Sequence, residues 1–576
     1  MQFWLVLIFL VSSLALLVPG ACLWDLLFPE ESIFERCVWG SVCGLAFAVY
    51  VAFVLAYWRL SLFWIGWAVL SVGVATLAVY RHLRNGSSLN RLGVTKPVLL
   101  ILGLVAISRF VPTLIHEWPP GWDPSFHLIL AKKVAMADGM IYDWTPFENV
   151  PLNYPLGSHF LLVLISRLSG LPLHRVFQML IPLIGVITTA EVYLLCLRFR
   201  LNEEIATFSA LAYGFWAAYG SIDYYRWGGL PNALAMTFLL AIIALVTAPA
   251  RTWRHVGLVA LFFAAICFAH HHVMITSGII LGVLSLYFFF SNRKGAAVAI
   301  LIGVSGGVLL GSFYLLPYLL KAASLSSTDV FRFNESQFTI FAPKFFLREM
   351  GPVFVLFSAG GLLLGWRARK ESQGLRCLFV ICGTLITLYL LFGPIYRQLA
   401  LRLTGQDYVA FTPSRFLMDM ACFMSIFAGY AAYRLRQRAR VSLAIAMVCG
   451  VFLGLSTYRT WQQMHEGGAP VGSWGAYHWI TANTPPDTIV LTTNSWACFA
   501  SWRRTLFSPL PISEPRHLDP ALETMRQQLQ EGIFSEEALR YELVKVIPPE
   551  EIPANKLLWK DSNGWSVVEV WPGGGK

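Results

Sequence analysis

The sequence predicts an all-α polytopic membrane bundle of about fourteen transmembrane helices that ends in a small extracytoplasmic α/β domain. Of its 576 residues, 57% are hydrophobic and only 13% are charged, whereas a soluble protein carries roughly 25% charged residues. Apolar runs of about 18 residues or more, long enough to cross a bilayer, recur along most of the chain. The formal net charge of +11 lies largely in short loops between these runs, so it indicates membrane orientation rather than nucleic-acid binding.

The apolar runs define the candidate transmembrane helices. The first lacks a basic segment before it, so we interpret it as a retained span rather than a cleaved signal peptide. The run 156–169 is too short to cross comfortably and is predicted to be an interfacial or re-entrant helix. The predicted spans lie near 2–23, 37–57, 60–80, 97–115, 175–197, 204–220, 231–249, 254–271, 273–291, 296–319, 351–366, 376–395, 413–433 and 441–458.

Six basic loops predict the orientation of these spans, because cytoplasmic loops are enriched in lysine and arginine. Their basic residues are Arg81, Arg84, Arg91, Lys96, Arg198, Arg200, Arg251, Arg254, Arg293, Lys294, Arg367, Arg369, Lys370, Arg434, Arg436, Arg438 and Arg440. If 156–169 does not cross, all six loops share one side, which we assign to the cytoplasm. The loops 116–174, 221–230 and 396–412 and the C-terminal region then face outward, across a prokaryotic plasma membrane.

The chain is predicted to have three parts: accessory transmembrane helices at 1–96, a transmembrane catalytic module at 97–458 with the outer loop 116–174, and an extracytoplasmic α/β domain at 459–576. In the last part, 488–492 reads as a strand after the turn at 484–487, and 520–545 is helix-prone. Residues 557–571 are predicted to form a hairpin, because the turn-forming residues 561–564 interrupt them.

An acid and a histidine stand together in the outer loop 116–174. Asp123 and Pro124 form a normal helix start, and His127, four residues on, would lie on the same helix face as Asp123. The pair either caps a helix and faces solvent, or supplies a general base or metal ligand at the membrane surface. We take Asp123 and His127 as candidate catalytic residues.

A second carboxylate, Asp223, lies in the next outer loop, beside the candidate substrate-binding residues Tyr225 and Arg226. It is either a solvated turn residue or a catalytic group that orients an acceptor or holds a divalent cation. Asp123 and Asp223 are therefore candidate ligands of Mg²⁺ or Mn²⁺.

Histidines and arginines on the outer side are candidate substrate-binding residues. His270, His271 and His272 lie between two apolar runs, where they form a polar turn or meet a phosphate or metal. Arg397, Arg402 and Arg415 are outer arginines, against the usual bias. Arg415 lies at the mouth of a span, where it either snorkels to lipid headgroups or grips a lipid-linked phosphate through two hydrogen bonds.

The sequence shows no P-loop and no dinucleotide-binding fingerprint, so no nucleotide cofactor is expected. A reaction on the outer face would then need another energy source, and a lipid-carried activated donor supplies one.

In its order of motifs the chain resembles the GT-C superfamily of membrane glycosyltransferases, which use polyprenyl-linked sugars. The resemblance runs from about residue 97 to the C-terminus, and Asn153-Tyr154-Pro155-Leu156-Gly157 is similar to the Tyr-Pro or Pro-Pro motif that follows the first catalytic loop of this family. Asn483-Thr484-Pro485-Pro486-Asp487 resembles the start of the family's outer domain. The chain differs in three extra N-terminal spans and lacks an obvious Trp-Trp-Asp motif, which argues against the oligosaccharyltransferase branch.

The resemblance implies that Asp123 takes the place of the catalytic acid and Asp223 that of the second acid, with Tyr154 and His159 near the substrate. It also implies an inverting transfer from a polyprenyl-phosphate or polyprenyl-pyrophosphate sugar to a glycan, lipid or protein acceptor. Two alternatives stay open: a transporter or flippase for a lipid-linked sugar, and a non-catalytic scaffold that binds glycans. Clustering of ionisable groups at one membrane face and the lack of a sequence repeat favour the enzyme.

Overall fold

The computed structural model describes residues 2–58, 73, 94–116, 118–119, 123–145, 147, 152, 154–248, 252–324, 350–370, 372–404, 413–443, 445–451, 473–485, 487–492, 496–502, 504–505, 543–547, 556–560 and 566–571. The chain forms two compact units: Met1–Glu117 with Tyr154–Met464, and Trp118–Asn153 with His465–Lys576. The first part of the outer loop therefore belongs to the same unit as the C-terminal region, whereas the sequence boundaries assigned all of 116–174 to the transmembrane module.

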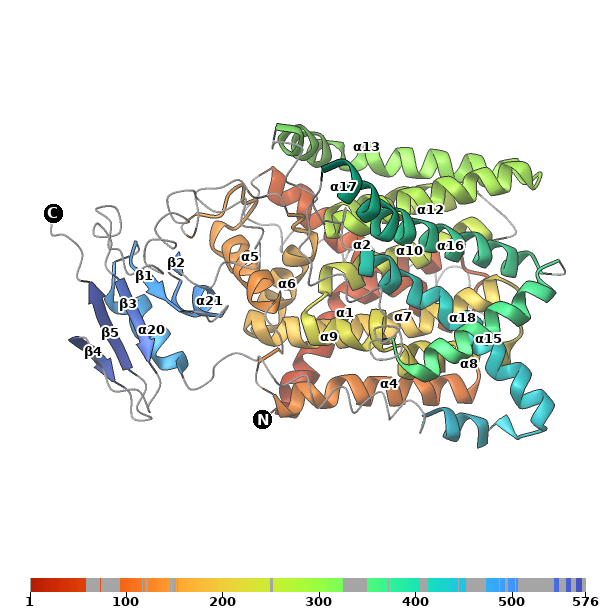
Figure 1. The fold of residues 1–576 in the computed structure, drawn as a ribbon, viewed down its shortest axis with the longest axis horizontal. Coiled ribbons are helices and arrows are strands. Elements are labelled where there is room, and N and C mark those ends of the chain that lie inside the picture. Colours follow the sequence, from red (N-terminus) through yellow and green to blue (C-terminus); the bar gives the residue numbers. More distant parts are fainter. Residues whose placement is uncertain are drawn as a thin grey trace. The chain divides into compact units, whose positions relative to one another are not determined.

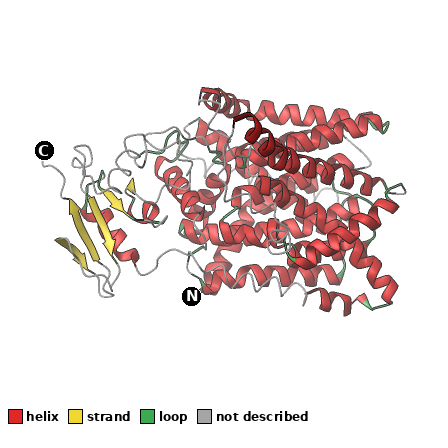
Figure 2. Ribbon diagram, viewed as in Figure 1, coloured by secondary structure: helices red, strands yellow, loops and turns green. Residues whose placement is uncertain are grey.

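The first unit is helical in its described residues (Figures 1 and 2). Its helices are α1 (Gln2–Leu27), α2 (Ile33–Tyr57), α4 (Lys96–Ile115), α6 (Gly157–Ser169), α7 (Leu173–Arg198), α8 (Glu203–Leu211), α9 (Asp223–Trp227), α10 (Leu230–Thr247), α11 (Trp253–Ala269), α12 (His271–Phe290), α13 (Lys294–Ser324), α15 (Pro352–Ala368), α16 (Gln373–Leu390), α17 (Tyr396–Thr404) and α18 (Pro413–Ala439). Short π-helical segments lie at η1 (Ala212–Trp216), η2 (Ala218–Ile222) and η4 (Leu391–Ile395).

Nine helices in the described part of the chain are long and apolar enough to cross a membrane. They are Phe3–Leu27, Ile33–Tyr57, Lys96–Ile115, Leu173–Arg198, Leu230–Thr247, His271–Phe290, Lys294–Pro317, Gln373–Leu403 and Arg415–Ala439. The predicted spans at 254–271 and 351–366 correspond to shorter apolar helices, Trp253–Ala269 and Pro352–Ala368. Of the predicted span at 60–80 only residue 73 is described, and of the span at 441–458 the described residues are 441–443 and 445–451, which are helical at 443 and 445–451.

The predicted span 204–220 is not one continuous helix. It runs as α8, η1 and η2, with a break at Ala217 and a left-handed backbone at Gly220 (φ 84°). Irregular backbone at this position leaves carbonyls that need donors. Arg109, a buried arginine in the apolar helix α4, supplies one by donating to the Gly214 carbonyl at 2.8 Å and to Ser221 Oγ at 3.2 Å.

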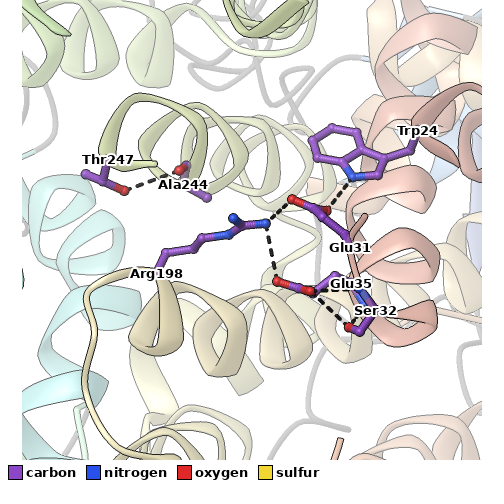
Figure 3. A network of polar contacts seen from close by, with 7 residues as sticks. All are labelled: Trp24, Glu31, Ser32, Glu35, Arg198, Ala244 and Thr247. Atoms are coloured by element: carbon purple, nitrogen blue, oxygen red, sulfur yellow. Dashed lines mark hydrogen bonds and ion pairs between the residues drawn. The ribbon is translucent and has the colours of Figure 1, made fainter. Parts of the chain in front are cut away.

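Opposite charges meet where α1 turns into α2. Figure 3 shows Arg198, at the end of α7, pointing toward Glu31 and Glu35; it pairs with Glu31 and lies 3.3 Å from Glu35 Oε1. Trp24 Nε1 donates to Glu31 at 2.8 Å. Arg198 belongs to one of the basic loops assigned to the cytoplasm, and the ion pairs give a physical reason for an acidic turn beside it.

The short helix α6 packs closely against its neighbouring helices because its first residue, Gly157, has no side chain. A Cβ atom at Gly157 would lie 2.7 Å from the Phe268 carbonyl oxygen and 2.8 Å from Val49 Cγ1. The side chains from Gly157 to Ile165 are buried. Helix α6 is thus held against α2 and α11, and only a glycine allows this approach.

We expect Gly157→Ala to destabilise the protein by about 1–3 kcal/mol, the usual cost of overpacking a dense site. Gly185→Ala is the matched control, because nothing lies within 4 Å of a Cβ atom built at that helical position. An alanine there should be neutral or stabilise the helix by up to about 1 kcal/mol. Thermal unfolding of the two purified variants measures the difference, and equal midpoints would show that the close approach is not a constraint.

The second unit contains a five-stranded sheet, of order β2-β1-β3-β5-β4. Strand β1 pairs in parallel with β2 and β3, and β5 pairs antiparallel with β3 and β4. The elements are α5 (Asp123–Ala137), α20 (Trp474–Asn483), β1 (Ile489–Leu491), α21 (Ala497–Ser501), β2 (Arg504–Thr505), β3 (Leu543–Ile547), β4 (Lys556–Lys560) and β5 (Ser566–Trp571).

The strand near 489 and the C-terminal hairpin lie where the sequence placed them. The helix expected at 520–545 falls mostly outside the described residues, and its last residues form β3 instead. Strand β3 is held between β1 and β5, so sheet pairing overrides local helix propensity there. Tyr477 and Ile480 of α20 pack on Val490, Val544 and Val567 of the sheet to form the core of this unit.

Candidate functional site

The first group of candidate residues lies at the start of α5. Asp123 Oδ2 lies 3.9 Å from His127 Nε2, and both side chains are largely buried. The spacing of four residues places them on one helix face, as the sequence predicted. A carboxylate beside an imidazole can accept a proton from a substrate and share it with the imidazole. General acid–base catalysis needs such an arrangement.

Two lysines of α5 contact other residues of the second compact unit. Lys133 donates to the Thr145 carbonyl and lies 3.8 Å from Asp143. Lys132 Nζ lies 4.3 Å from the ring centroid of Trp502, which directly follows α21. Burial lowers the pKa values of both lysines. Lys132 therefore links the helix that carries Asp123 to the C-terminal region, and Lys133 links it to the outer loop that follows the helix.

The second group lies at the turn between α11 and α12. His270 caps α12: its Nδ1 accepts from the Val273 backbone N–H at 3.3 Å. Arg415 Nη1 lies 2.8 Å from Nε2 of the same ring, and the tautomer of the ring decides which of these two contacts is the hydrogen bond. His270 thus contacts the Arg415 guanidinium, whose other N–H donors can bind an anionic oxygen.

Tyr154 joins this group by ring contacts. Its ring centroid lies 5.8 Å from those of His159 and His271 and 6.5 Å from that of His270, each in edge-on geometry. Burial lowers the pKa of His159 to about 3, although backbone carbonyls of Pro155 and Leu156 oppose the shift. His159 is therefore neutral at pH 7 and cannot itself neutralise a phosphate.

His272 points to residues that the sequence analysis missed. Its Nε2 lies 3.3 Å from Oδ2 of Asp419, a fully buried carboxylate within α18. Asn232 Nδ2 lies 3.3 Å from Asp419 Oδ1 and donates to the Tyr224 hydroxyl at 2.8 Å. The sequence did contain a signal for Asp419, because it is an acid inside an apolar run and ionisable groups in a membrane span are usually functional.

Asp223 shapes its own loop. Its Oδ1 accepts from the Gly220 backbone N–H at 2.6 Å, which holds the left-handed turn before α9. Tyr225, two residues on, contacts Gln178 Nε2 at 3.4 Å, and burial raises the pKa of its hydroxyl above the usual range. Gln178 and Arg175 both donate to the His116 carbonyl at 2.9 Å. Arg175 and Gln178 thereby tie the end of α4 to the Asp223 loop, another link that the sequence did not reveal.

The structure brings together most of the candidate substrate-binding residues near the turn between α11 and α12. Tyr154, His159, His270, His271, His272 and Arg415 form one cluster, whereas Arg402 is exposed on α17. Arg397 is half-buried on the same helix, and the Arg226 side chain lies outside the described residues. Asp123 and His127 belong to the other unit.

Within the described residues, no group of three or more His, Cys, Asp or Glu side chains is arranged to hold a metal ion. The two predicted metal ligands, Asp123 and Asp223, belong to different units, and Asp223 is engaged by Gly220. The assignment of Asp123 and Asp223 as ligands of a divalent cation therefore stays a prediction, and we derive no step through a metal.

No protein-family model matches the sequence, and no curated protein matches it. Solved structures do match in fold. ArnT from Cupriavidus metallidurans bound to undecaprenyl phosphate has a TM-score of 0.52 at 12% identity, over 83% of this chain and 99% of that one. Archaeal oligosaccharyltransferase AglB from Archaeoglobus fulgidus, in complex with an inhibitory peptide and a dolichol-phosphate, has a TM-score of 0.52 at 11% identity, over 78% and 69%. The Archaeoglobus fulgidus oligosaccharyltransferase in complex with Zn and sulfate has a TM-score of 0.52 at 12% identity, over 78% of this chain and 68% of that one.

The apolar helices and these likenesses define a multi-pass membrane protein. Its fold is similar to those of ArnT and the archaeal oligosaccharyltransferase, and this is the GT-C fold that the sequence predicted. The likeness is one of fold alone, so the activity has to be argued from the residues.

Proposed function

We propose that the protein is a membrane glycosyltransferase that moves a sugar from a polyprenyl-phosphate or polyprenyl-pyrophosphate donor to an acceptor on the extracytoplasmic face. The observation that carries the proposal is Arg415, which lies 2.8 Å from His270 Nε2 at the start of α18, in a fold shared with structures that hold undecaprenyl phosphate or dolichol-phosphate. Arginine binds phosphate oxygens through two parallel N–H donors, and the start of an apolar helix is where a lipid head would sit.

The reaction we propose is a single displacement. An acceptor hydroxyl oxygen attacks the anomeric carbon while the bond from that carbon to the donor phosphate oxygen breaks, which inverts the anomeric configuration. The hydroxyl proton passes to the carboxylate of Asp123, with His127 fixing its orientation. Negative charge gathers on the departing phosphate, and Arg415, which His270 contacts, stabilises it by hydrogen bonds. Asp223 orients the acceptor.

The proposed orientation follows the basic loops of the sequence. Arg198 and its acidic partners lie at the Thr247 end of α10, as Figure 3 shows, and the Asp419 cluster lies at the Asn232 end. These ends are separated by most of an 18-residue helix, or about 27 Å at 1.5 Å per residue. With Arg198 in the cytoplasm, the histidine cluster faces outward, in a prokaryotic plasma membrane.

A transfer assay tests the function. Purified protein in lipid nanodiscs is given undecaprenyl phosphate carrying radiolabelled monosaccharides, with a membrane extract as the source of acceptors. We expect undecaprenyl phosphate to be released while label appears in a product that is no longer attached to the carrier. If label instead crosses the bilayer of sealed proteoliposomes while still attached to the lipid, the protein is a flippase and the proposal is wrong.

A further inference from the structure

The carboxylate of Asp419 has no part in the chemistry described above. It lies in α18, inside an apolar span, and is 0% exposed. A charged or strongly polar group in such surroundings is costly unless it is paired, and membrane proteins rarely keep one without a function.

Asp419 has partners on two other helices. Asn232 of α10 donates from Nδ2 to Oδ1 at 3.3 Å, and Oδ2 lies 3.3 Å from His272 Nε2 of α12, a close approach without hydrogen-bond geometry. These contacts connect residues that are far apart in sequence. Asp419 therefore joins three helices at one buried point.

Both branches of this network end at the candidate site. His272 lies two residues after His270, and their ring centroids are 6.2 Å apart. Asn232 donates to Tyr224, the neighbour of Asp223. On α18 itself, Arg415 precedes Asp419 by four residues, so both lie on the same helix face. The carboxylate thus sits beneath the point where Arg415 and His270 meet.

We propose that Asp419 is a positioning residue for the donor phosphate site. It holds His272, and with it the first turn of α12, beside α18, so that His270 keeps its 2.8 Å contact with Arg415 and the guanidinium stays oriented toward a phosphate oxygen. Asp419 does not touch the phosphate and acts through His272. The inference rests on the proposed function, since it assigns how the same site binds a lipid phosphate.

Three variants test this inference: Asp419→Asn, His272→Gln and the double variant. Asparagine keeps the size of the side chain and an oxygen for Asn232 but replaces the carboxylate oxygen that faces His272. We expect each single variant to bind undecaprenyl phosphate about tenfold more weakly, and the double variant to be no weaker than the singles, because the two residues act as one unit. Donor KM should rise while kcat at saturating donor stays close to the wild-type value.

Ser425→Ala is the matched control. Ser425 is also buried on α18, but its hydroxyl donates to Ala421 of its own helix. Its affinity for undecaprenyl phosphate should equal that of the wild type. If Asp419→Asn fails to fold, His272→Gln carries the test alone from the other side of the contact.

The outcomes separate the two proposals. Wild-type affinity in Asp419→Asn or His272→Gln, or losses that multiply in the double variant, would overturn the positioning role. A wild-type protein that binds no undecaprenyl phosphate would overturn the proposed function, and with it this inference.

Discussion

Asp123→Asn is expected to lower sugar transfer by about two to four orders of magnitude, the range that general acid–base catalysis supplies. Asparagine cannot accept the proton of the attacking hydroxyl. It does begin a helix about as well as aspartate, so α5 and its contacts through Lys132 and Lys133 should be retained. The rate of transfer and the thermal unfolding midpoint are measured on the same preparation, and only the rate should change.

Asp143→Asn is the control for this substitution. Asp143 is an exposed carboxylate in the same unit that accepts from the Thr145 backbone N–H at 3.0 Å, a bond that the asparagine oxygen can keep. Its removal should leave transfer unchanged. Wild-type turnover in Asp123→Asn would leave Asp123 with a capping role alone and would remove the catalytic assignment.

Arg415→Ala should weaken binding of undecaprenyl phosphate about ten- to a hundredfold, because a charge-assisted hydrogen bond contributes roughly 1.5–3 kcal/mol. Arg415→Lys should bind with intermediate affinity: lysine restores a charge but not the planar pair of donors. The contact of Arg415 with His270 Nε2 at 2.8 Å makes an arginine oriented by His270 the expected phosphate ligand. Titration of the purified variants with undecaprenyl phosphate measures the affinities.

The control removes an arginine from the other end of the same helix. Arg438 is exposed near the end of α18, so Arg438→Ala changes the net charge equally without reaching the cluster. If Arg415→Ala and Arg415→Lys bind as tightly as the wild type, Arg415 only snorkels to lipid headgroups, and the phosphate site moves to Arg397 or Arg402.

The features that the sequence determined are local or depend on composition. Membrane insertion follows from long apolar runs, and the Asp123–His127 pair follows from a spacing of four residues in one helix. The strand at β1 and the hairpin of β4 and β5 were predictable from alternating apolar residues and turn residues. The clustering of His270 with Arg415 was expected only as a shared membrane face, and the sequence did not indicate a direct contact.

The features that only the tertiary structure decided are contacts between helices that are far apart in the chain. Arg415 meets His270 across 145 residues, Asp419 meets Asn232 across 187, and Arg109 reaches Gly214 across 105. A helix that is apolar on every side shows no periodicity that tells which face meets which neighbour. Its few polar side chains can find partners on any adjacent helix. The sequence by itself therefore determined that this is a membrane bundle with an acid–histidine pair in its outer loop. Helix packing decided that Asp419, His272 and Asn232 meet beneath the histidine turn, because packing alone sets which polar groups in an apolar surrounding come within hydrogen-bonding distance.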